Sequence, residues 1–209
     1  MRKTTAAALV TAAAAATAVG FSASPAFAAT WTVSGSSGSG GAYTATAGTT
    51  TLKDTTSGTT LTCTSSHAAG NIPNGTGLSG TNIGSITSAT FTSCSGPLGL
   101  TFTVTGTFPW HLNAITYHSA TGVTDGTVTG VSAHLSGPGC SANVTGGTPG
   151  TYTNSTAKLA LSPSAPNTTG VSLTISGVSG CFGLIGNGHT ATFTSTYSVS
   201  PSTIHITSP

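Results

Sequence analysis

The segment Ala191-Thr-Phe-Thr-Ser-Thr-Tyr-Ser-Val199 alternates apolar and hydroxyl-bearing side chains along most of its length. Residues 101–108 and 171–176 follow the same pattern. Successive side chains of a β-strand point to opposite faces, so this alternation predicts half-buried strands. Threonine suits such strands because its β-branched carbon fits the pleated surface and its hydroxyl keeps the outer face wet without charge.

Further strands are predicted over residues 31–33, 43–47, 60–64, 83–93, 112–117, 127–135, 152–161 and 204–206. The alternation slips within two of them, which predicts bulges near Ser88 and Gly130. Glycine-containing pairs, among them Asp125-Gly126 and Gly146-Gly147, are typical of turns. Beyond the first 28 residues we find no helical stripe, so the expected fold class is all-β, an antiparallel β-sandwich or barrel.

The first 28 residues are organised like a cleavable secretory signal peptide. Arg2 and Lys3 give a positive start, an alanine-rich apolar run follows, and Ala26-Phe27-Ala28 matches the small-x-small cleavage pattern. We expect cleavage after Ala28 and a secreted single β-domain over residues 29–209. Later runs fall short of the ~18 apolar residues of a spanning helix, so no transmembrane segment is expected.

Four cysteines, Cys63, Cys94, Cys140 and Cys181, are distributed along the exported part. An even number in an exported chain predicts two disulfides. Of the three pairings we prefer Cys63 with Cys94 and Cys140 with Cys181, because each half of the domain would then carry its own link. The domain would consist of two related halves, about 29–135 and 136–209, if it arose by duplication.

Charged residues after residue 28 are limited to Lys53, Lys158, Asp54 and Asp125. Two basic and two acidic residues balance, which excludes the basic surface that nucleic-acid binding requires. A pair of catalytic carboxylates would have to be Asp54 and Asp125. We interpret Asp54 as a solvated partner of Lys53, and Asp125 as an exposed residue of a turn. The sequence therefore predicts no catalytic residues, no cofactor and no enzymatic activity.

The candidate ligand-binding residues are Trp110, His111, Asn113, Tyr117 and His118. Aromatic faces supply apolar contact and polar tips orient a ligand, so this cluster favours a carbohydrate or a small apolar molecule. The alternative is that Trp110 is a core residue. His111 and His118 are seven residues apart and would point to opposite faces of a regular strand. We therefore expect no metal site.

Three motifs, Ile86-Thr-Ser-Ala-Thr-Phe-Thr-Ser-Cys94, Pro109-Trp-His-Leu-Asn113 and Gly126-Thr-Val-Thr-Gly-Val131, carry a resemblance. Together with the signal composition, they resemble a group of uncharacterised secreted proteins of actinobacteria. The likeness spans most of the exported chain. It implies an extracellular location and brings no activity, cofactor or site residue.

We therefore expect a secreted, non-catalytic binding or surface-associated module of unknown extracellular ligand. The alternative is a structural or self-assembling surface protein, because strands rich in Thr and Val with almost no charge favour edge pairing. A variant of that alternative is a flat Thr-x-Thr array that orders water or ice. A hydrolase is the third class, and it would need a cleft that unites a histidine with Asp54 or Asp125.

Overall fold

The computed structural model describes residues 30–166 and 170–209, and the predicted signal peptide lies outside them. These residues form strands and two short 3₁₀ turns, which confirms the all-β fold class. The elements are β1 (Thr30–Ser34), β2 (Ala42–Ala47), β3 (Thr50–Asp54), β4 (Thr60–Asn71), β5 (Gly75–Ser79), β6 (Gly84–Ser95), η1 (Pro97–Gly99), β7 (Thr101–Gly106), β8 (Trp110–His118), β9 (Val123–Gly137), β10 (Cys140–Thr153), β11 (Lys158–Leu161), β12 (Leu173–Gly180), η2 (Cys181–Gly183), β13 (Thr190–Ser200) and β14 (His205–Thr207).

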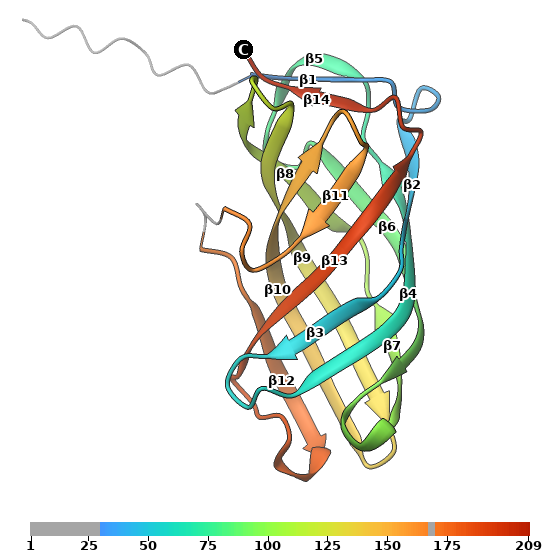
Figure 1. Ribbon diagram of the computed structural model, residues 1–209, viewed down its shortest axis with the longest axis vertical. Helices are drawn as coiled ribbons and strands as arrows, with labels where there is room; N and C mark the ends of the chain where they lie inside the picture. Colours follow the sequence, from blue (N-terminus) through green and yellow to red (C-terminus); the bar gives the residue numbers. More distant parts are fainter. Residues whose placement is uncertain (1–29, 167–169) are drawn as a thin grey trace, which may run out of the picture.

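Eleven strands form one antiparallel sheet that closes on itself (Figure 1). The pairings run from β10 through β12, β13, β2, β4, β6, β7 and β9, and β9 pairs with β10 again. The other three strands each bridge two members of this ring: β3 joins β13 to β4, β8 joins β6 to β9, and β11 joins β10 to β13. The walls of the ring face one another across a shared interior, as the two sheets of a sandwich do.

A second sheet, in the order β14-β1-β5, lies across one end of the ring (Figure 1). Its inward side chains, Trp31, Val33 and Ile206, are buried and belong to the main hydrophobic core. This sheet therefore closes one end of the interior with apolar side chains. The opposite end carries η1, η2 and the turn between β9 and β10 (Figure 1).

The predicted alternation is present in β13, where Ala191 and Tyr197 are buried and the threonines between them are more exposed. Both predicted bulges are confirmed. The β4–β6 register shifts at Ala69 and Gly70, opposite Ser88. The β9–β10 register shifts next to Gly130, whose φ of 69° lies in the region that favours glycine.

Some predicted turns are wrong. Gly126 lies inside β9, and Gly146 and Gly147 lie inside β10. Glycine is needed inside these strands because neighbouring backbones come close to them. A side chain at Gly126, for example, would collide with the carbonyl oxygen of Asn113 on β8. The predicted strand 152–161 is in fact the end of β10, a turn and β11, and residue Ala157 in that turn has a positive φ of 49°.

Both disulfides pair as predicted. Cys63–Cys94 joins directly opposed residues of β4 and β6, and Cys140–Cys181 joins the start of β10 to η2. Each link therefore fixes the register of neighbouring elements at the same end of the ring. Strands from both predicted halves contribute to one ring, and the relation of the halves by duplication stays a prediction.

Candidate functional site

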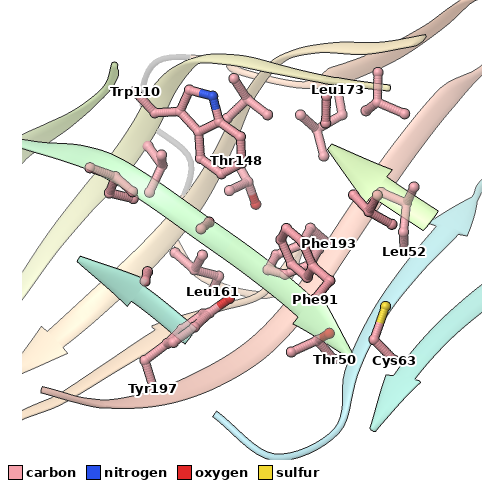
Figure 2. Close-up of a pocket in the computed structure, with 18 of the residues that line it drawn as sticks. Thr50, Leu52, Cys63, Phe91, Trp110, Thr148, Leu161, Leu173, Phe193 and Tyr197 are labelled. Carbon is pink, nitrogen blue, oxygen red and sulfur yellow. The ribbon is translucent and has the colours of Figure 1, made fainter. Parts of the chain in front are cut away.

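The interior of the ring contains a cavity of about 90 Å³. All eleven strands of the closed sheet contribute to its wall. The described residues of the wall present apolar side chains and a few hydroxyl groups, and none of them is charged (Figure 2). Two smaller hollows, of about 60 and 50 Å³, share wall residues with it. One of them shares Val128 and Leu161, and the other shares Leu52 and Leu61. The two smaller hollows therefore adjoin the main cavity.

Trp110 is 7% exposed and forms part of the cavity wall (Figure 2). Its indole N–H donates to the carbonyl oxygen of Thr107 at 2.8 Å, and the ring of Phe108 packs against it with centroids 4.7 Å apart. Because its polar atom is already bonded to the backbone, Trp110 offers the cavity an apolar surface. Trp110 is therefore a core residue and a cavity residue at the same time.

The other four candidate residues from the sequence do not line this cavity. Asn113 is engaged in the sheet: its Nδ2 donates to Thr127 and Thr129, and its Oδ1 accepts from the backbone of Asn82. Tyr117 packs against the main core. The remaining two, His111 and His118, lie on the outer face of β8.

His111 and His118 share a face because β8 contains a register shift between Ala114 and Thr116. Ala114 and Tyr117 are three residues apart, yet both pack against the core. The alternation of inward and outward side chains along β8 therefore shifts by one residue between them. The expectation that the two histidines point to opposite faces is therefore wrong. Within the described ranges no group of three or more His, Cys, Asp or Glu side chains is placed to hold a metal ion.

The polar groups in the cavity wall are hydroxyls. Burial raises the pKa of Tyr43, whose hydroxyl donates to the carbonyl oxygen of Ser85 at 3.2 Å. Burial also raises the pKa of Tyr197, and the hydrogen bond that Ser66 Oγ donates to the Tyr197 hydroxyl at 2.8 Å opposes the rise. Both phenols are therefore neutral at ordinary pH.

Thr50 is the exception among these hydroxyls. It is 1% exposed and lies in the cavity wall, and its Oγ1 has no hydrogen-bond partner among the residues that the structure describes. Figure 2 places its oxygen on the side of the Phe91 and Phe193 rings. Sequence reasoning missed Thr50 because it missed β3, where Thr50, Leu52 and Asp54 alternate inward.

The two acidic side chains of the chain, Asp54 and Asp125, are both paired with histidines. Asp54 Oδ2 lies 2.7 Å from His189 Nδ1, and Asp125 Oδ2 lies 2.7 Å from His118 Nε2. The expectation that Asp54 and Asp125 are exposed to solvent is wrong, since both are buried. Asp125 lies inside β9 and not in a turn, whereas Asp54 is the last residue of β3 and leads into a turn. The reason is that each carboxylate has a hydrogen-bonding imidazole beside it, and Asp54 has backbone donors as well.

Asp54 is the more completely bonded of the two. Its Oδ1 accepts the backbone N–H groups of Thr56 and Ser57 at 2.8 and 3.1 Å, in addition to the contact of its Oδ2 with His189. Burial raises the pKa of Asp54, but the hydrogen bonds from His189, Ser57 and Thr56 outweigh that effect and hold the pKa below its usual value.

A carboxylate that orients an imidazole is one half of a nucleophile-activating triad, which also needs a hydroxyl or thiol bonded to the other ring nitrogen. In His189 the other nitrogen, Nε2, packs so close to Gly186 that a Cβ at that position would lie 2.6 Å from it. The residue beside Nε2 is therefore a glycine, which has no nucleophilic side chain. The pair stabilises the turn that follows β3.

Comparison with known protein families, curated proteins and solved structures found no match to this chain. Across residues 30–166 and 170–209, no helix is long and apolar enough to cross a membrane.

Proposed function

We propose that this chain is a secreted, non-catalytic binding protein that takes a small apolar molecule into the interior of its ring of strands. The observation that carries the proposal is the apolar cavity of about 90 Å³. Protein interiors are normally packed to the density of organic crystals, so a hollow of this size is a departure that needs a reason. Ligand sites are typically concave, apolar and equipped with a few polar groups, as this one is.

An apolar molecule suits the site better than a carbohydrate. A sugar requires several hydrogen-bonding partners around its ring, whereas this wall offers isolated hydroxyls between apolar side chains. An engineered apolar cavity of about 150 Å³ stays dry and takes up benzene or xenon. By that standard, the cavity in this chain suits xenon or an organic molecule with few heavy atoms.

Secretion is supported by the signal-like residues 1–28 and by the two disulfides, which persist in oxidising compartments. The absence of catalysis is supported by the use of both carboxylates in structural pairs with histidines. A hydrolase screen of the secreted protein should find no turnover, and turnover that disappears in an Asp54→Asn, Asp125→Asn double variant would contradict this part of the proposal.

The binding proposal is tested with xenon as the probe, followed by the chemical shift of dissolved ¹²⁹Xe. Ala133 lies in the cavity wall, and Ala133→Leu should fill the hollow and abolish the shift. Ala160 lies on the outer face of β11 between two wall residues, Leu159 and Leu161, so Ala160→Leu is the matched control and should leave the shift intact. A wild-type protein that does not perturb the xenon signal would refute an accessible cavity.

Self-association is a second candidate, and one observation favours it. Leu98 in η1 and Phe182 in η2 are 95% and 79% exposed, and both turns lie at the end of the ring away from the β14-β1-β5 sheet. Large exposed apolar side chains often mark contact sites, and near-zero net charge offers little repulsion. Sedimentation velocity over a range of concentrations should show oligomers that a Leu98→Ser, Phe182→Ser double variant lacks. Monomers at every concentration would remove this candidate.

A further inference from the structure

The hydroxyl of Thr50 is the most unusual polar group in the cavity. Its side chain is almost completely buried, at 1% exposure, yet its Oγ1 has no partner. Burial without a hydrogen bond forfeits the bonds that the hydroxyl makes with water, and valine has nearly the same shape without that penalty. A threonine at this position is therefore unfavourable for the empty protein.

Among the described residues, no neighbouring group is hydrogen-bonded to Thr50 Oγ1. The hydroxyls of Tyr43 and Tyr197, which also line the cavity, are bonded to Ser85 and Ser66. Ser195 Oγ is likewise buried without a partner, but Ser195 is not part of the cavity wall. Thr50 is thus a free hydrogen-bonding group at the wall of an apolar hollow.

We propose that the ligand is an uncharged, mainly apolar molecule with a single hydrogen-bonding group, and that Thr50 Oγ1 binds this group. The inference rests on the proposed function and narrows its ligand class. A hydroxyl both donates and accepts, so a small alcohol, phenol or ketone satisfies Thr50. A carboxylate or an amine is excluded, because the cavity wall contains no charged group to compensate a buried ion.

The test uses two ligands of nearly equal shape, 2-propanol and 2-methylpropane, which differ by a hydroxyl in place of a methyl group and have four heavy atoms each. Binding of each is measured by NMR titration to the wild type, to Thr50→Val and to Thr50→Ser. The wild type should bind the alcohol, and Thr50→Val should bind it about three- to tenfold more weakly, which is the range expected for one hydrogen bond. Binding of 2-methylpropane to Thr50→Val should be as tight as to the wild type, or tighter.

The controls separate the hydroxyl from other effects. Thr50→Ser keeps the hydroxyl and should retain the preference for the alcohol. Ser195→Ala removes the neighbouring hydroxyl outside the wall and should leave both affinities unchanged. If Thr50→Val does not fold, Thr50→Ala removes the same hydroxyl with a smaller side chain and takes its place.

The outcomes distinguish this inference from the proposed function. Equal affinity of wild type and Thr50→Val for 2-propanol would overturn the role of Thr50 and leave the cavity proposal standing. Xenon binding without binding of either organic ligand would overturn the inference on ligand class alone. If neither xenon nor the organic ligands bind, the proposed function fails, and the inference fails with it.

Discussion

Replacement of the buried Asp54 by alanine should destabilise the protein strongly. The carboxylate makes three hydrogen bonds, to His189 and to the backbone of Thr56 and Ser57. A hydrogen bond to a charged group contributes about 1.5–3 kcal/mol. Water can replace part of each bond in the variant, because Thr56 and Ser57 are exposed and the His189 side chain is 28% exposed. We therefore expect a net loss of about 2–4 kcal/mol in the free energy of unfolding.

The assay is urea unfolding at pH 7 with both disulfides intact, in which the midpoint should fall at constant slope. Asp54→Asn keeps one acceptor oxygen and should lose about half as much as Asp54→Ala. Lys53→Ala changes the exposed neighbour and should stay within about 0.5 kcal/mol of the wild type. A loss below about 0.5 kcal/mol for Asp54→Ala would refute a structural role for this carboxylate.

The same residue predicts a dependence of stability on pH. The pKa of Asp54 is lower in the folded protein than its ordinary value of about 3.9, so the folded state favours the ionised form. Its contribution to stability is present above the ordinary pKa and is lost as the pH falls through the lowered one. Between pH 5 and pH 2 the wild type should therefore lose more stability than Asp54→Ala, and parallel losses would contradict the sign of the shift.

Three further outcomes are expected. Peptide mapping without reductant should recover both disulfides as they are paired in the structure. Removal of either disulfide should lower the free energy of unfolding by ~4 kcal/mol on the loop-entropy model. Phe182 is largely exposed with φ of 51°, so Phe182→Gly should raise the free energy of unfolding by about 0.5–1 kcal/mol in the same urea assay, and a clear loss would mean that its ring is anchored. The intact mass of secreted protein should correspond to a start at Ala29, and a retained leader would contradict cleavage.

The fold was largely predictable because its signal is local. Alternation along residues 191–199 marks β13 without knowledge of any neighbour, and the spacing of the cysteines favoured the observed pairing. β3 was missed because Lys53 and Asp54 at its end indicate a solvated turn. Turns were wrongly predicted at Gly126 and Gly147 because a glycine that allows two strands to approach closely cannot be told from a turn glycine by sequence alone.

The candidate site was predictable only in part. Trp110 stood out because tryptophan is rare and large, and it does line the cavity. Thr50 is one of many threonines, and its lack of a partner depends on how β3 packs within the closed sheet. Whether inward side chains fill a ring or leave it hollow depends on its diameter, which the number and tilt of the strands set together. No single segment carries that information.

The pairing of β1 with β14 places the two ends of the described chain side by side, with Thr32 opposite Thr207 and a hydrogen bond from Ser208 to Thr30. A short linker could therefore join the ends, and new termini could be opened in the turn around Pro138 at the far end of the ring. Such a circular permutant would keep every strand pairing. A partner fused to the new termini would lie beside the disulfides, whereas a partner fused to the present ends would lie beside the β14-β1-β5 sheet. The protein could therefore be attached to a surface by either end of the ring.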